Sequence, residues 1–367
     1  MRRRRWVPVV LFAAVSIAAG LVVRQVTTRA RPAIRVQGNR LVDGSGRALR
    51  LFGVNRSGTE YQCVIGGPSG AGIFSGPSDV ASIAAMAAWH VNAVRVPLNE
   101  DCWLGINGVN AAHSGPRYRG AIARFVASLT HAGLVTILDL HWNAPGTALS
   151  DGQQLMADAD HAPAFWTSVA TRFKANPAVM FDLYNEPNGI SWTCWLSGCV
   201  TTEGWRAAGM QTLVDAVRRT GARQVIIAAG LGHANDLSQW LRYQPRDPVH
   251  QLVAGVHVYD TGPSDYCNTV PCWDDTIGRV AREVAVVTSE IGEHDRRSDF
   301  VTGYMEWADG QARAGRSVSF LGWSWDAAQG EGGPSLIRSF DATPTTYGLG
   351  FRAYLARLFE QGRIARL

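Results

Sequence analysis

Two glutamates in distant parts of the chain end apolar, β-rich runs and could serve together as a pair of catalytic carboxylates. Glu186 stands in residues 183–187 (LYNEP), and Glu290 stands in residues 287–292 (VTSEIG). Two carboxyl groups about 5–5.5 Å apart can cleave a glycosidic bond with retention of configuration, one as acid/base and the other as nucleophile. These roles require different pKa values, raised for the acid and ordinary or low for the nucleophile. The two glutamates form such a pair only if the fold brings them together.

Eight short, apolar, β-rich runs can position these residues. They alternate with amphipathic segments predicted as helices at residues 78–89, 118–132, 164–175, 204–219, 277–283, 300–314 and 347–359. Continuously hydrophobic strands that alternate with helices indicate a parallel sheet. Eight such units favour an α/β fold of the (β/α)8 TIM-barrel class, preceded by a short N-terminal β-hairpin within residues 34–51. The eight runs are residues 49–55, 91–98, 134–143, 179–186, 224–230, 252–260, 284–290 and 317–325.

Polar side chains gather where these runs end. The carboxyl ends of the strands form the active-site face of such a barrel, so the side chains are expected to meet there. A single one of them has an ordinary explanation as a cap or a solvent-facing group, but polar ends on seven of eight runs indicate a site. The set comprises Asn55, Arg95, Asp139, His141, Asn185, Glu186, His257, Tyr259, Glu290 and Trp323.

In order and spacing these motifs resemble glycoside hydrolase family 5, the cellulase family of retaining (β/α)8-barrel glycosidases. The resemblance extends from residues 47–55 (RALRLFGVN) to residues 323–325 (WSW). It implies that Glu186 protonates the leaving oxygen and that Glu290 attacks the anomeric carbon. Glu293, three residues further on, is the alternative nucleophile, but only Glu290 ends a predicted strand.

The resemblance also implies roles for the supporting residues. Asn185 would hold the sugar 2-hydroxyl, and His141 would bind another hydroxyl. Arg95 and Tyr259 would hydrogen-bond the nucleophile, while His257 would lie beside the acid/base. Trp323 would form the floor under the sugar ring, with Trp325 as the alternative because it shares the same strand parity.

The predicted activity is hydrolysis of a β-linked polysaccharide or oligosaccharide, as by an endoglucanase, with no metal or cofactor. A β-mannanase, an exo-β-glucanase or a glycolipid glycosidase would use the same mechanism, since loops decide the substrate. The glycine-rich insertion 57–77 does not match a cellulase loop. From other classes, a metal-dependent barrel hydrolase would use Asp139, His141 and His257 as ligands. Such a hydrolase normally has clustered histidines, and this sequence has no His-x-His pair. An inactive sugar-binding barrel would not need both glutamates.

The N-terminus is predicted to be a targeting segment. Four arginines, residues 2–5, precede an apolar run at residues 6–23. We interpret residues 1–32 as a signal peptide or a membrane signal-anchor, and residues 33–367 as the catalytic domain. The domain is expected outside the cytoplasm, either secreted or anchored to the outer face of the cytoplasmic membrane, and as a monomer.

Charge and cysteines agree with an exported glycan hydrolase. Seven of the 35 basic residues and none of the 30 acidic ones precede Pro32, which leaves 28 basic residues against 30 acidic ones. That balance argues against a nucleic-acid partner. Six cysteines suggest disulfides rather than zinc, because C-x2-C spacing is missing. The spacing favours Cys194 with Cys199 and Cys267 with Cys272, which leaves Cys63 with Cys102.

Thirteen tryptophans are many for this length. Aromatic faces stack on the apolar faces of sugar rings, although a tryptophan in a soluble protein more often packs in the core. We expect two or three of the tryptophans in predicted loops to contact sugar, from the set Trp103, Trp142, Trp192, Trp195 and Trp273.

Overall fold

A computed structural model describes residues 32–364 except residues 68, 263–265, 329 and 331–332. The predicted targeting segment therefore lies, apart from its last residue, outside the described residues. No helix within the described part of the chain is long and apolar enough to cross a membrane.

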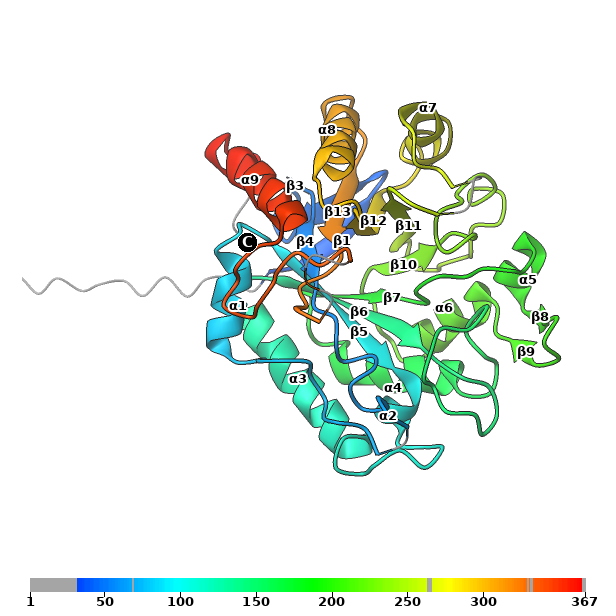
Figure 1. The fold of residues 1–367 in the computed structure, drawn as a ribbon. Coiled ribbons are helices and arrows are strands. Elements are labelled where there is room, and N and C mark those ends of the chain that lie inside the picture. Colours follow the sequence, from blue (N-terminus) through cyan, green and yellow to red (C-terminus); the bar gives the residue numbers. More distant parts are fainter. Residues whose placement is uncertain (1–31, 68, 263–265, 329, 331–332, 365–367) are drawn as a thin grey trace, which may run out of the picture. The chain divides into compact units, whose positions relative to one another are not determined.

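Eight parallel strands close into a barrel, which confirms the predicted fold class (Figure 1). Each strand pairs with the next one along the chain, and the last barrel strand pairs with the first. All eight predicted runs contribute one strand each. The strands are β4 (Phe52–Asn55), β5 (Ala93–Asn99), β6 (Val135–Trp142), β7 (Val179–Asp182), β10 (Ile226–Ala229), β11 (Leu252–Tyr259), β12 (Val286–Gly292) and β13 (Val318–Gly322).

Helices surround the barrel (Figure 1), and the longer ones bury an apolar face against the core. In α6 (Met210–Arg219) the buried Met210, Leu213, Val214 and Val217 recur at helical spacing. Residues 231–251, between β10 and β11, form turns without a helix. The other helices are α1 (Val80–Ala87), α2 (Glu100–Leu104), α3 (Gly115–His131), α4 (Ala162–Phe173), α5 (Trp192–Ser197), α7 (Val270–Trp273), α8 (Asp299–Arg313) and α9 (Thr346–Glu360), with a π-helical turn at η1 (Asp274–Gly278).

Some details differ from the sequence-based prediction. In place of the helix predicted at residues 277–283, helical structure begins earlier, with α7 and η1, and residues 281–283 form a turn. The N-terminal hairpin of β1 (Ile34–Gln37) and β2 (Arg40–Asp43) gains a third strand, β3 (Ala48–Leu49), because Leu49 pairs with Leu41 rather than beginning the first barrel strand. The helix predicted from residue 204 begins at Met210, since β9 (Arg206–Ala207) pairs with β8 (Cys199–Val200).

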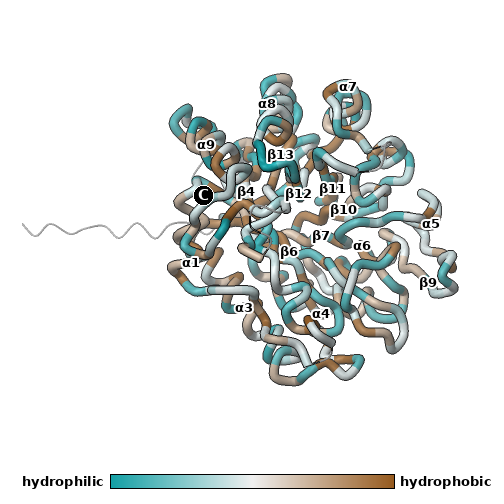
Figure 2. Tube along the Cα trace, in the orientation of Figure 1, coloured by the Kyte–Doolittle hydropathy of each residue, from teal (hydrophilic) through white to brown (hydrophobic). Residues whose placement is uncertain are grey.

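The alternation of side chains along the strands divides the core into two parts. Along β5, Ala93 joins an inner cluster within the barrel, and Val94 joins the outer core beneath the helices. Ile34, Leu41 and Leu49 of the small N-terminal sheet pack against the inner cluster. Apolar stretches accordingly follow the central strands in Figure 2. The inner positions near the carboxyl ends of the strands hold polar groups instead.

All six cysteines are paired in the predicted way, as Cys63–Cys102, Cys194–Cys199 and Cys267–Cys272. The first disulfide joins the insertion 57–77 to α2. Three disulfides are typical of proteins that fold outside the reducing cytoplasm.

Candidate active site

Arg95 organises the barrel mouth from a fully buried position. Its Nη1 donates to Oε1 of Glu290 at 2.7 Å, and its Nη2 donates to Oδ1 of Asn185, also at 2.7 Å. Nε donates to Oδ2 of Asp182 at 3.0 Å, and Nη2 lies 3.0 Å from Oδ2 of Asp139. Burial lowers the pKa of Arg95, but the three carboxylates outweigh it and hold that pKa above its usual value. The guanidinium is therefore a permanent positive charge beneath the site.

Glu290 is held by two donors. Besides Arg95, the hydroxyl of Tyr259 donates to its Oε2 at 2.6 Å. The register of β12 against β13 shifts between Thr288 and Ile291, and a bulge of this kind redirects side chains. As a result, two consecutive side chains reach the barrel mouth. Oγ of Ser289 lies 3.1 Å from Nε2 of His257, and Glu290 contacts Arg95 and Tyr259.

Glu186 lies four residues beyond the end of β7, in a segment that continues along the barrel. The backbone N–H of Leu183 donates to the carbonyl of Ile227 at 3.0 Å, and that of Asn185 donates to the carbonyl of Leu140 at 3.1 Å. Because of these bonds, the segment after β7 continues along the barrel as far as its mouth. There a carboxylate oxygen of Glu186 lies within 4.8 Å of a carboxylate oxygen of Glu290. The two predicted glutamates therefore face one another across the site.

Three side chains contact the Glu186 carboxylate. Nδ1 of His257 lies 2.8 Å from Oε1, Nε2 of Gln153 donates to Oε2 at 3.1 Å, and Nδ1 of His233 lies 3.6 Å from Oε2. Burial raises the pKa of Glu186, but the histidines and Gln153 outweigh burial and hold that pKa below its usual range. The pKa of Glu186 is therefore shifted in the direction opposite to the one expected for the acid of such a pair.

His141 and Trp323 form one wall of the site. Their rings stack with centroids 5.2 Å apart and planes 5° apart, and Nδ1 of His141 lies 2.6 Å from Oδ2 of Asp139. Burial lowers the pKa of His141, yet the charges of Asp139 and Glu60 raise it above its usual value. Trp325, the alternative sugar platform, is 1% exposed and packs edge-on against Trp89 in the core.

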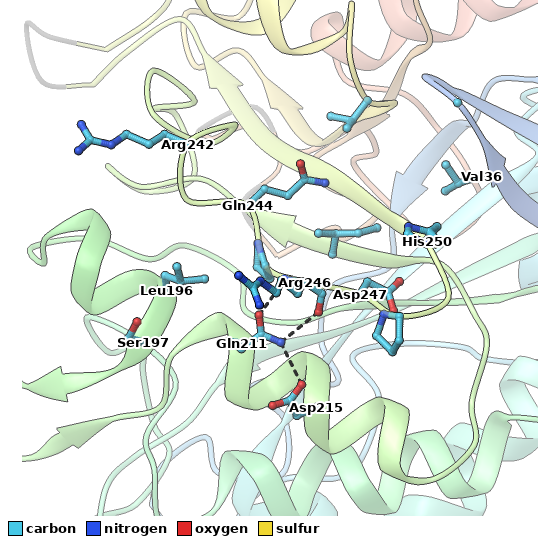
Figure 3. A pocket seen from close by; sticks show the side chains of 15 residues that line it. Val36, Leu196, Ser197, Gln211, Asp215, Arg242, Gln244, Arg246, Asp247 and His250 are labelled. Carbon is cyan, nitrogen blue, oxygen red and sulfur yellow. Dashed lines mark hydrogen bonds between the residues drawn. The ribbon is translucent and has the colours of Figure 1, made fainter.

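These groups line an open cavity of about 600 Å³ that includes His141, Gln153, Asn185, Glu186, Tyr259, Glu290 and Trp323. A larger groove of about 1240 Å³ lies elsewhere, near β1 and α6 (Figure 3). There Gln211 already donates to Asp215 at 2.9 Å and to the carbonyl of Arg246 at 3.0 Å. That groove contains neither glutamate of the pair, so size does not identify the site.

The structure does not favour the alternative nucleophile or the set of potential metal ligands. Glu293 accepts from the backbone N–H of Val301 at 3.1 Å and does not line the cavity. The potential ligands Asp139, His141 and His257 do not surround one point, because Asp139 pairs with Arg95 and His141 while His257 contacts Glu186.

The expectation that two or three loop tryptophans contact sugar is wrong for most of that set. Their indoles fill the space between loops and helices, and only Trp142 is partly exposed. The side chains buried in the core are Trp103, Trp192, Trp195 and Trp273.

Sequence reasoning missed three residues of the site. Asp182 has a recognisable signal, an acidic side chain at an inner position of a buried strand. Gln153 lies in the loop before α4, and His233 lies in the turn after β10, with a left-handed φ of 57°. Neither of these two has a strand-end position or a motif, so only the folded loops reveal them.

The parallel eight-stranded barrel, with a close pair of glutamates at its mouth, indicates that the protein is a glycoside hydrolase. Comparison with known families agrees, because residues 42–329 match the cellulase model, glycosyl hydrolase family 5. The chain belongs to glycosyl hydrolase family 5.

Individual relatives are more distant. The chain is 30% identical to endoglucanase 1 of Saitozyma flava over 224 residues, which is 58% of this chain and 60% of that protein. It is 24% identical to an endoglucanase of Paenibacillus polymyxa over 341 residues, 82% of this chain and 81% of that one. The crystal structure of a β-glucanase from Saccharophagus degradans with cellotetraose has the same fold, with a TM-score of 0.65, 19% identity, and coverage of 90% of this chain and 94% of that chain.

Proposed function

We propose that this chain hydrolyses β-1,4-linked glucan by double displacement, with Glu186 as acid/base and Glu290 as nucleophile. The observation that carries the proposal is the separation of the two carboxylates, with oxygens within 4.8 Å of one another. That separation suits a retaining pair, whereas an inverting pair stands about 6.5–9.5 Å apart to admit a water molecule.

The surroundings of the two glutamates suit these different roles. Glu290 receives hydrogen bonds from Arg95 and Tyr259, which stabilise a carboxylate and orient it for attack on the anomeric carbon. Glu186 lies on the more open side of the pair, its side chain 20% exposed against 4% for Glu290. A leaving group that departs towards solvent would therefore pass Glu186.

Glu186 must gain a proton before it can act as an acid. In the substrate-free site its pKa is low because His257, His233 and Gln153 contact the carboxylate. A bound glycan that displaces one of these contacts raises that pKa, since loss of a favourable partner disfavours the charged form. His233, whose side chain is 44% exposed, is the contact that we expect a sugar to displace.

Asn185, His141 and Trp323 are placed to hold the sugar beside the carboxylates. The side-chain carbonyl of Asn185 accepts from Arg95, which turns its amide N–H groups towards the cavity, where one donates to Gln153 at 2.7 Å. A sugar 2-hydroxyl can replace Gln153 as the acceptor. The Trp323 ring, stacked on His141, offers an apolar face for the sugar ring.

The choice of β-1,4-glucan rests on the relatives, two of which are named endoglucanases, and on the cellotetraose bound to the Saccharophagus degradans β-glucanase. The experiment is incubation with cello-, manno- and laminari-oligosaccharides of equal length and sizing of the products. We expect the highest kcat/KM on cello-oligosaccharides, with internal cleavage. A preference for manno-oligosaccharides, or release of terminal glucose alone, would replace the substrate assignment.

Proton NMR of the first-formed product tests the mechanism independently of the substrate. A β-configured hemiacetal is expected, and an α-configured product would refute double displacement.

We also propose that residues 33–367 are a monomeric catalytic domain exported by residues 1–32. The disulfides and the apolar N-terminal run support an extracytoplasmic location. N-terminal sequencing of the exported protein separates the two forms: cleavage near residue 18 would indicate secretion, and an intact N-terminus in the membrane fraction would indicate anchoring.

A further inference from the structure

A second group of potential ligands lies outside the proposed catalytic site. It consists of Glu100, the first residue of α2, together with Asp158 and His161 from the loop that leads into α4. One ligand atom from each lies within 4.8 Å of the other two. Neither Glu100 nor Asp158 takes part in the chemistry described above.

Glu100 is buried beside a second carboxylate, and burial together with Asp158 holds its pKa well above the usual value. Its side chain is completely buried, and neither carboxylate oxygen makes a hydrogen bond of normal geometry within the described part of the chain. Asp158 is equally buried, and two neighbouring carboxylates repel one another in a medium of low polarity. Among the described residues, only His161 offers a basic group within ion-pair distance of either carboxylate.

The distances suit a shared cation. Nδ1 of His161 lies 3.9 Å from Oε1 of Glu100 and 3.7 Å from Oδ1 of Asp158, and it too lacks a hydrogen bond. Two ligand atoms bound tetrahedrally to one ion at about 2.1 Å are about 3.4 Å from each other, a few tenths of an ångström less than these two distances. The His161 side chain is 24% exposed, which leaves a route from solvent to the two buried carboxylates.

We propose that Glu100, Asp158 and His161 form a structural site for one divalent transition-metal ion, with Zn²⁺ as the best match. Two carboxylates and one imidazole are ligands of zinc, whereas Ca²⁺ and Mg²⁺ prefer oxygen ligands throughout. The three ligands supply two negative charges, which the cation neutralises. A fourth position remains for water.

The location gives the ion a role in holding the loop that precedes α4. Asp158 accepts from Nδ2 of Asn143 at 2.9 Å, and the hydroxyl of Tyr184 donates to Oδ1 of Asn143 at 3.0 Å. The same hydroxyl accepts from the backbone N–H of Gln154 at 3.0 Å. The adjacent residue, Gln153, contacts Glu186. An ion between α2 and this loop therefore stabilises the segment that carries Gln153.

The test measures zinc on the full exported domain after removal of metal with a chelator. Purified protein is titrated with Zn²⁺, and bound metal is determined by elemental analysis and by isothermal titration calorimetry. The variants are E100Q and H161Q. D160N is the matched control, because Asp160 is an exposed acid in the same loop. E290Q is a second control, since Glu186, His257 and Glu290 also lie within ligand distance of one another.

We expect one equivalent of zinc on the wild type, on D160N and on E290Q, with a rise in Tm of about 3 °C or more on saturation. In H161Q, and in E100Q if it folds, affinity should fall at least tenfold and the rise in Tm should disappear. Absence of stoichiometric zinc binding by the wild type would overturn the proposal. The two carboxyl groups of Glu100 and Asp158 would then share a proton instead of binding an ion. Binding lost in E290Q but kept in H161Q would assign the ion to the catalytic carboxylates and overturn it equally.

Discussion

Arg95 donates to Glu290 across 2.7 Å from a position with no exposure to solvent, and the same guanidinium contacts Asn185, the residue before Glu186. One cation therefore positions both halves of the carboxylate pair. Its neighbours Asp139 and Asp182 lie at ion-pair distance as well. The proposed catalytic geometry depends on a buried charge network as much as on the two glutamates.

The azide products of two truncated variants distinguish the proposed roles of the glutamates. E290A and E186A should each lose at least about 10⁴-fold in kcat on unactivated glycans, as for the loss of other catalytic groups that act as a unit. With added azide, E290A should yield the α-glycosyl azide, because azide attacks from the face that the nucleophile occupied. E186A should yield the β-glycosyl azide through the intermediate on Glu290. The reverse pattern would exchange the two assignments.

Removal of the Arg95 charge should destabilise the fold. R95M leaves three buried carboxylates without their cation, and breaking a buried pair in this way costs about 3–5 kcal/mol. Urea denaturation measures the loss in the free energy of unfolding. R95K is the control, since it keeps the charge but not the planar fork of donors, and it should lose less stability while still losing activity. Equal stability of R95M and the wild type would contradict the network.

Replacement of His233 should change the pH dependence of activity. Burial raises the pKa of Glu186, and His233 is one of the partners that lower it, so H233Q should raise that pKa. The general acid then stays protonated to a higher pH, and the alkaline limb of the kcat/KM profile should move to higher pH. H131Q, at an exposed position on α3, should leave the profile unchanged. A shift to lower pH, or none, would remove His233 from the site.

The two tryptophans after β13 should respond differently to truncation. W325A removes a side chain that is 1% exposed and should lower the free energy of unfolding by about 3–5 kcal/mol. W323A should leave stability nearly unchanged and weaken substrate binding about tenfold, a loss of about 1.4 kcal/mol. Urea denaturation and kcat/KM on one oligosaccharide separate these effects. Weaker binding in W325A alone would reverse the assignment of the platform.

Loss of the Cys63–Cys102 disulfide should cost more than loss of a short-range one. In the chain-entropy model, the sequence separation of 39 residues corresponds to about 4 kcal/mol, and that of 5 residues to about 2 kcal/mol. Double serine variants of Cys63 with Cys102 and of Cys194 with Cys199 provide the comparison in urea. Equal losses would show that strain or residual structure, rather than loop closure, dominates.

The pattern of the sequence was sufficient for the barrel and for the pair of glutamates. Continuous apolar runs and amphipathic helices are local properties, and their alternation specifies parallel strands whose carboxyl ends share one face. Residues that end these runs, such as Asn55 and Tyr259, could therefore be placed together from the order of the runs alone. The pairing of the cysteines also followed from spacing.

Only the tertiary structure determined the positions of site residues that lie on loops or on irregular strands. The bulge in β12 turns Glu290 towards Arg95, and a regular alternation of side chains does not reveal it. Gln153 and His233 reach Glu186 from loops whose paths are set by packing rather than by a periodic pattern. Burial of Trp103 and Trp195 likewise depends on which helices cover them. Local periodicity determined the scaffold, and long-range packing determined which side chains surround the carboxylates.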